Sequence, residues 1–157
     1  MGGLNDSVME ILREAKTLAR RYRAITGKPL GITGEVAEYE AARILGVELT
    51  YARQAGFDAI ERVDGQTRRL QIKGRCLSEK YKQGQRLGSI DITKEWDAVL
   101  LVLLDEGFNV FAVYEADRDP VIGALTAPGS KARNERFALS ISKFQSIARL
   151  RWKRDIA

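Results

Sequence analysis

The chain has no histidine and only one cysteine among its 157 residues. The lack of histidine excludes Ser-His-Asp triads, Cys-His nucleophile pairs, histidine-based zinc hydrolases and nucleases with a histidine general base. Cys76 alone can form neither an internal disulfide nor an ordinary zinc site, so a reducing compartment is the simplest expectation. Any catalysis must therefore rely on carboxylates, lysine or a metal ion.

Long apolar runs and disorder-prone stretches are also missing. The chain is 45% hydrophobic, has three prolines and contains no low-complexity run. This composition suits a single compact domain over residues 1–157. No apolar run reaches the roughly 18 residues that a membrane span needs, and residues 1–4 lack the features of a signal peptide. We therefore expect a soluble, cytoplasmic protein with no membrane partner.

Basic residues are concentrated in two segments. Residues 62–86 carry a formal charge of +6 and residues 131–154 carry +7, whereas the whole chain carries only +5. Such polarity is expected of a protein that docks on a phosphate backbone, and a solvated basic surface has the same pattern. The residues expected to contact nucleic acid are Arg75, Lys80, Lys82, Arg86, Lys131 and Arg133.

The strongest local signal is a hairpin turn at Asp64-Gly65. The flanking segments 57–63 and 67–73 are rich in β-branched and apolar residues, as strands are. A two-residue turn fixes the register of the two strands, because it pairs Val63 with Gln66 and every further pair lies one residue farther from the turn on each strand. This register places Asp58 opposite Gln71.

The same hairpin has one polar and one apolar face. Alternate residues of a strand point to the same side, so Lys73 joins Asp58 and Gln71. The opposite side carries residues that suit a core: Phe57, Ala59, Leu70 and Ile72. The sequence therefore predicts an acid, an amide and a lysine together at the edge of a buried sheet.

Helical periodicity predicts two helices before the hairpin. Apolar residues recur at helical spacing over 4–22, and this first helix should end near Gly27. A second helix is expected over about 34–45, with Thr33 as its N-cap and Gly46 as its left-handed terminator.

The remaining elements complete a mixed architecture. In chain order we expect a strand at 47–53, a Gly- and Lys/Arg-rich loop at 74–93, and a hairpin of strands 96–104 and 108–114. A strand at 136–141 follows. The chain then forms a terminal helix that opens with the capping-box pattern 142–145 and runs through Ile147 and Leu150. Trp96 is expected in the core. This order predicts an α+β or α/β sandwich around a mixed central sheet.

Three short motifs together resemble the restriction endonuclease-like, or PD-(D/E)XK, nuclease superfamily: Glu35 early in a helix, Gly56-Phe57-Asp58, and Gln71-Ile72-Lys73. The resemblance covers roughly residues 31–114 and implies an α/β/α sandwich with helices on both sides of a mixed sheet. The family usually has glutamate where Gln71 stands, but Q-x-K occurs in its Mrr-type branch. The chain also resembles small uncharacterised bacterial proteins of this fold.

The resemblance implies a catalytic set of Glu35, Asp58, Gln71 and Lys73 that hydrolyses DNA with Mg²⁺ or Mn²⁺. Such ions prefer oxygen ligands, here Asp58, Gln71, the Ile72 carbonyl and Glu35. Lys73 would orient the attacking water and neutralise the phosphate. Glu38 and Glu40 are alternatives to Glu35, since Glu38 lies one helical turn along nearly the same face.

Two other functions fit the sequence. One is a non-catalytic nucleic-acid-binding protein, in which Gln71 marks the decay of a metal site. The other is a protein-interaction module that uses the charge polarity to bind another protein. DNA is favoured over RNA as the nucleic acid, and a homodimer, with the first helix able to supply its interface, is a family-level expectation.

Overall fold

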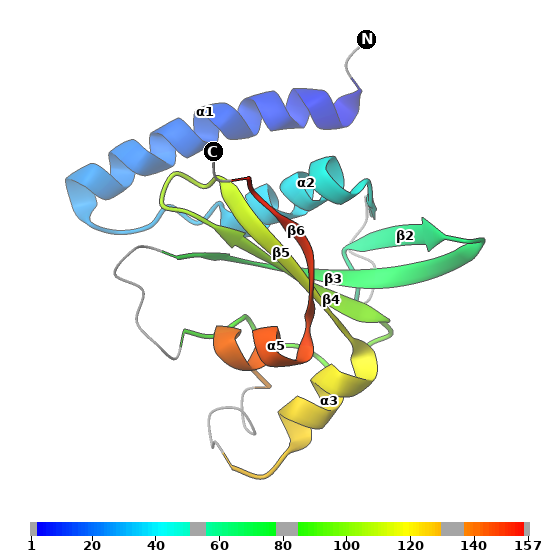
Figure 1. Cartoon of the computed structure of the whole chain (residues 1–157). Coiled ribbons are helices and arrows are strands. Elements are labelled where there is room, and N and C mark those ends of the chain that lie inside the picture. The colour runs from blue at the N-terminus through cyan, green and yellow to red at the C-terminus, as the bar shows by residue number, and fades with distance from the viewer. Residues whose placement is uncertain (1–2, 51–55, 78–84, 130–136, 156–157) are drawn as a thin grey trace.

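The computed structural model describes residues 3–50, 56–77, 85–129 and 137–155. These residues form one six-stranded sheet in the order β1-β2-β3-β4-β5-β6, in which only the β3–β4 pair is parallel (Figure 1). The strands are β1 Glu48–Leu49, β2 Ala59–Val63, β3 Gln66–Cys76, β4 Ala98–Leu104, β5 Val110–Asp117 and β6 Arg149–Lys153. The helices are α1 Leu4–Thr26, α2 Thr33–Leu45, α3 Arg118–Thr126 and α5 Ile141–Ile147. The expected mixed sheet with flanking helices is confirmed at this level.

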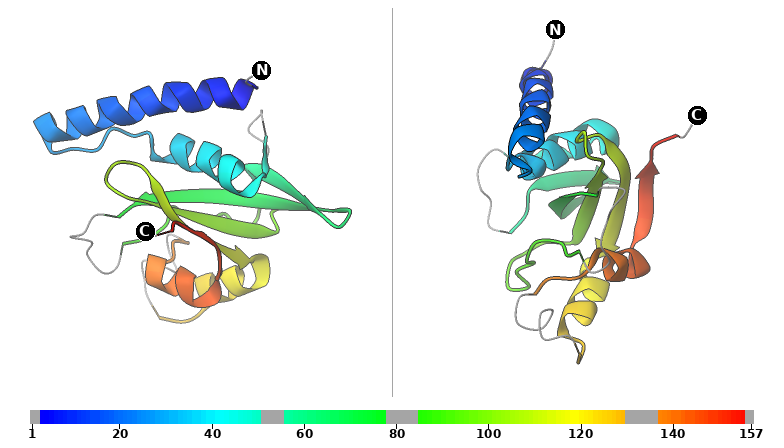
Figure 2. Two further views of the ribbon diagram at one scale, coloured as in Figure 1. Left: turned by 45° about the horizontal axis from the view of Figure 1, so that its top comes forward. Right: turned by 90° about the vertical axis from the view of Figure 1, so that its left-hand side faces the viewer.

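The sheet is covered on both faces. Helices α1 and α2 lie on one side, and α3 and α5 lie on the other (Figures 1 and 2). Alternate residues of β4 enter two separate cores, so that Leu100 packs with α1 and α2 while Leu101 packs with α3 and α5. Every residue of β4 is buried, as the continuous apolar run predicts, and Trp96 is 1% exposed.

The β2–β3 hairpin forms as predicted over most of its length. Asp64 and Gly65 adopt φ values of 51° and 77°, the left-handed pair that a tight hairpin turn requires. The predicted register holds from the Val63–Gln66 pair to the Ala59–Leu70 pair.

Beyond Ala59 the hairpin departs from the prediction. The Asp58 N–H donates to the Leu70 carbonyl at 2.8 Å, so Asp58 does not face Gln71 in regular pairing. Phe57 packs into the core on the α3 and α5 side, whereas Ala59 packs on the other side. The strand alternation that assigned Phe57 to the same face as Ala59 does not extend past the start of β2.

Both predicted helix terminators are confirmed, since Gly27 and Gly46 have φ values of 70° and 74°. The predicted N-cap is wrong. Thr33 is the first residue of α2, and Ile32 occupies the cap position without a side-chain hydrogen bond. The Thr33 hydroxyl instead contacts the Cys76 sulfur at 3.8 Å.

The loop expected from residue 74 begins later, because Gly74 to Cys76 continue β3 and pair with β4. A β-carbon on Gly74 would lie 2.6 Å from Cβ of Ala37 and 3.2 Å from the Thr33 carbonyl oxygen. Glycine at this position therefore lets α2 approach the sheet, whereas the sequence predicted the start of a loop.

The C-terminal expectations are also corrected. Ser140 caps α5 by accepting a hydrogen bond from the Lys143 N–H at 3.1 Å, and Leu150 lies in β6 rather than in a helix. In place of the expected strand at 136–141, the described residues 137–141 make one isolated bridge, between Ser140 and Arg86.

Two further differences concern the extent of elements. Helix α3 was not predicted, because its three buried residues, Val121, Ala124 and Leu125, form too short an apolar pattern. The strand expected at 47–53 is seen only as β1, and 51–55 lie outside the described residues.

None of the helices in the described part combines the length and apolar character needed to cross a membrane.

Candidate functional site

The irregular end of the β2–β3 hairpin borders a cavity of about 870 Å³ that also touches α1, α2 and β1. Its acidic, basic and amide-bearing residues are Asn5, Glu35, Glu38, Glu48, Asp58, Gln71 and Lys73. All four side chains predicted as catalytic, Glu35, Asp58, Gln71 and Lys73, therefore line a single cavity.

Asp58 replaces a backbone acceptor where the strand pairing ends. Its Oδ2 accepts a hydrogen bond from the Ile72 N–H at 2.8 Å, which fixes the carboxylate against β3. No hydrogen bond from the described residues reaches Oδ1. An extended residue directs its N–H and C=O toward the same neighbouring strand, so the Ile72 carbonyl faces the Asp58 side.

Gln71 is buried rather than exposed, with 7% of its surface accessible. Its Nε2 donates to the Gly56 carbonyl at 2.9 Å. Its Oε1 is buried and has no hydrogen-bond partner among the described residues. Leaving a buried acceptor unsatisfied costs about 1–3 kcal/mol. The buried oxygen is therefore a position where a donor or a cation would be stabilising.

Two glutamates one turn apart on α2 line the same cavity, Glu35 exposed and Glu38 half-buried. Burial, followed by the charges of Asp58 and Glu35, raises the pKa of Glu38 to about 7. Glu38, the alternative to Glu35 in the sequence analysis, is thus an acid of α2 whose pKa its surroundings raise. The three-residue spacing of Glu35 and Glu38, which places them on nearly the same helix face, is the sequence feature that indicates Glu38.

Glu40 has a structural role instead. It is 5% exposed and is hydrogen-bonded to Lys16 at 3.3 Å and to Arg43 at 2.6 Å. These contacts hold α1 to α2 and leave Glu40 outside the cavity lining.

Lys73 is half-buried, and its Nζ donates to the Ser89 carbonyl at 2.9 Å. Burial lowers the pKa of Lys73, and the negative charge of Asp58 opposes that shift. This hydrogen bond ties the segment around Ser89 to strand β3 at the site, a contact that no local sequence signal could reveal.

The residues expected to contact nucleic acid divide into two groups. Arg75 donates to the carbonyls of Arg86 at 2.6 Å and Gly74 at 2.8 Å, and Arg86 donates to the Ala138 carbonyl at 2.7 Å. These two guanidinium groups therefore hold backbone segments together. The other four lie outside the described residues: Lys80, Lys82, Lys131 and Arg133.

The described residues contain no trio of acidic or cysteine side chains with metal-binding geometry. Oxygens are nevertheless available from the Asp58 carboxylate, the buried Gln71 amide and the Ile72 carbonyl. This donor set suits a hard cation such as Mg²⁺ and provides less negative charge than a site with glutamate in place of glutamine.

No protein-family model matches this chain, and no curated protein matches it either. The fold and the cavity define an α+β protein with a polar site at the edge of a mixed sheet. The function must therefore be argued from the chemistry of that site.

Proposed function

We propose that this protein is a metal-dependent nuclease that hydrolyses DNA phosphodiester bonds, as in the PD-(D/E)XK superfamily that its motifs resemble. The observation that carries the proposal is the buried, unpartnered Oε1 of Gln71, a residue that lines one cavity together with Asp58 and Lys73. A buried amide oxygen without a partner, in a residue that shares a cavity with an acid of raised pKa, is typical of a ligand site rather than of a structural network.

The residues present fit Mg²⁺ or Mn²⁺. Asp58, Gln71, the Ile72 carbonyl and Glu35 would hold the ion through oxygen atoms, which such cations prefer. A bound cation would give Gln71 Oε1 a partner. When bound, it would supply electrostatic stabilisation of the charge that develops on the phosphate.

The protein's own groups supply the remaining chemistry. The Ile72 N–H fixes the orientation of Asp58. Glu38, with a pKa of about 7, is suited to accept a proton from the attacking water near neutral pH. Lys73 would place its ammonium group against the phosphate oxygens, where a positive charge is most stabilising.

The basic segments would hold the DNA backbone beside the cut. Lys73 is bonded to Ser89, so the segment that begins at 85 lies against the site. We expect Lys80 and Lys82 just before that segment, and Lys131 and Arg133 in the second basic region, to contact phosphates. Binding through such contacts should weaken steeply as salt rises.

A non-catalytic DNA-binding protein is the second candidate. It is favoured by the neutral amide at Gln71 and by the engagement of Lys73 with the Ser89 carbonyl. In that case the cavity would retain the fold of a nuclease site without enough negative charge to hold a cation.

The test is cleavage of supercoiled plasmid by the purified protein with Mg²⁺ or Mn²⁺, with EDTA as the metal-free control. Asp58→Asn and Lys73→Met should each reduce cleavage by about 100-fold or more. Lys28→Met, a change at an exposed lysine outside the cavity, is the matched control and should cleave normally.

Other outcomes separate the alternatives. Absence of cleavage, with salt-sensitive DNA binding retained in both variants, would identify a binding protein. Absence of DNA binding at low salt would contradict both proposals and favour the protein-interaction module.

A further inference from the structure

Helix α1 carries an apolar surface that the described part of the protein does not cover. Five of the seven large apolar side chains that are exposed in the described residues lie on this one helix. They are Leu4, Ile11, Leu18, Tyr22 and Ile25, with exposed fractions from 41% to 83%. In Figures 1 and 2, α1 lies outside α2, at the margin of the molecule.

The exposed residues have the spacing of a coiled-coil seam. Leu4, Ile11, Leu18 and Ile25 recur every seven residues, and Val8, Ala15 and Tyr22 stand between them. This alternation of three- and four-residue steps continues over three heptads. A surface helix that packs only on its own domain needs a single apolar stripe.

The stripe that packs on the core is a different one. The buried residues of α1 are Met9, Leu12, Lys16 and Ala19. Each follows a member of the heptad pattern by one residue, so the two stripes lie side by side. Core packing therefore accounts for the second stripe. Of the first stripe, Val8 also packs against this core. The five exposed members, Leu4, Ile11, Leu18, Tyr22 and Ile25, are not covered by the described residues.

We propose that α1 pairs with α1 of a second copy of this chain, as an antiparallel two-stranded coiled coil that makes the protein a homodimer. Charge complementarity favours the antiparallel arrangement. Glu14 and Arg21 are exposed on the same flank of the stripe, and neither has an ion-pair partner among the described residues. If Ala15 packs opposite the partner's Leu18, Glu14 faces the partner's Arg21, and the two-fold axis repeats this pair.

A parallel pairing lacks that complementarity. The flanking positions that meet in a parallel coiled coil are five residues apart, which would bring Glu14 against the partner's Ala19. Ala19 is 1% exposed because it belongs to the core-facing stripe. The dimer proposal does not depend on nuclease activity, since it uses only the surface of α1.

The test is sedimentation equilibrium of the full chain from about 1 to 100 µM. The native sequence should be dimeric, and Ile11→Glu and Leu18→Glu should raise the dissociation constant by about tenfold or more, because each places two charges in the apolar seam. Thr17→Glu adds the same charge at an exposed position outside the seam and should remain dimeric. Far-UV circular dichroism verifies that each variant is folded.

A monomeric native protein over the whole concentration range would overturn the proposal, as would a dimer that Leu18→Glu does not weaken. The charge swap tests the orientation. Glu14→Arg and Arg21→Glu should each weaken the dimer, and the double variant should restore it. A dimer that depends on the apolar seam but is not restored by the double variant would overturn the antiparallel arrangement.

Discussion

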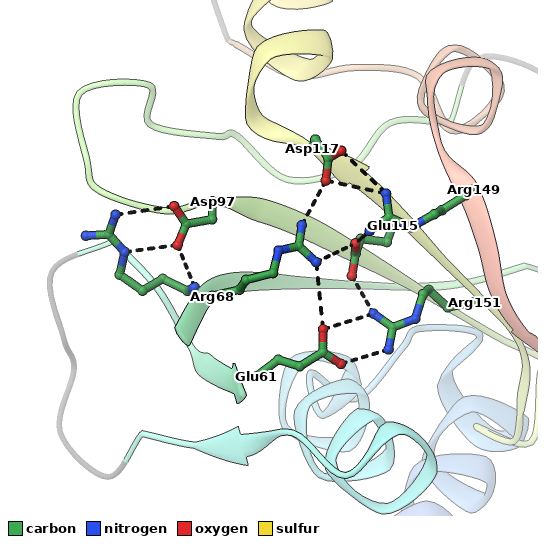
Figure 3. A network of polar contacts seen from close by, with 8 residues as sticks. Glu61, Arg68, Asp97, Glu115, Asp117, Arg149 and Arg151 are labelled. Carbon is green, nitrogen blue, oxygen red and sulfur yellow. Dashed lines mark hydrogen bonds and ion pairs between the residues drawn. The ribbon is translucent and has the colours of Figure 1, made fainter. Parts of the chain in front are cut away.

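The two ends of the β2–β3 hairpin treat buried polar groups in opposite ways. Near the turn, Glu115 of β5 is completely buried and accepts from Arg151 at 2.6 Å and from Arg68 at 2.9 Å, with Arg149 also paired to it (Figure 3). Arg151 also donates to Glu61 at 2.8 Å. Strands β2, β3, β5 and β6 are thereby joined through one network of charges.

At the opposite end, the polar groups lack such partners. Gln71 Oε1 is buried and unsatisfied, and Glu38 is close enough to Asp58 and Glu35 for their charges to raise its pKa. The pKa of Glu61, by contrast, is lowered, chiefly by its hydrogen bond from Arg151. The charges at the first end therefore satisfy one another, whereas the second end leaves a buried acceptor unpaired, and this contrast is what our proposal of a ligand site rests on.

The largest expected effect comes from disrupting the charge network around Glu115, which we call the satisfied end of the hairpin. Glu115→Ala removes the carboxylate shared by Arg68, Arg149 and Arg151, and we expect a loss of about 3 kcal/mol in the free energy of unfolding. Urea denaturation measures it. Glu115→Gln keeps an acceptor and should lose less. A loss below about 1 kcal/mol for the alanine variant would show that the network contributes little.

Glu38→Gln, in contrast to Glu115→Ala, should increase the free energy of unfolding, and the size of the increase should depend on pH. The raised pKa means that the folded state keeps a proton that the unfolded state releases between about pH 4.5 and pH 7, so stability falls as pH rises through that window. Removing the charge should stabilise the protein by about 2 kcal/mol at pH 8 and by much less at pH 5. Urea denaturation in EDTA at both pH values tests this. Equal effects at the two pH values would contradict the origin of the shift.

Gln71→Glu tests whether the unsatisfied end is a cation site. A second buried carboxylate beside Asp58 should destabilise the metal-free protein by about 1–2 kcal/mol. Mg²⁺ should raise the melting temperature of the variant more than that of the native protein, because added ligand charge strengthens cation binding. An identical Mg²⁺ response in both proteins would argue against a metal at this position.

The parts of the site that depend on local chemistry could be predicted from the sequence. The Asp64-Gly65 turn fixes the strand register as far as the Ala59–Leu70 pair. Asp58, Gln71 and Lys73 lie beyond that pair and still line one cavity, as predicted, although Asp58 does not face Gln71. The predictions that proved wrong concern residues whose conformation depends on tertiary contacts. Gly74 was predicted to begin a loop, but it lies in a strand, where the close approach of α2 requires glycine.

The same limit applies to the ends of elements. Strand β2 begins only at Ala59 because the Asp58 carboxylate takes the Ile72 N–H that a longer strand would have bonded. The charged network at Glu115 joins the β2–β3 hairpin to β5 and β6, which are distant from it in sequence, and no spacing rule reveals such a set. Local patterns thus located the candidate site and did not show which of its groups are satisfied.

The smallest expected effect provides the control for the satisfied end. Arg62 pairs with Glu48 at 3.6 Å, and both side chains are about two-thirds exposed. Arg62→Gln should change the free energy of unfolding by less than about 0.5 kcal/mol, because water already solvates both charges. Arg68→Gln, on the facing strand of the same hairpin, removes contacts to the buried Glu115 and should cost clearly more. If urea denaturation gives equal losses for the two variants, burial of the carboxylate is not what makes the network stabilising.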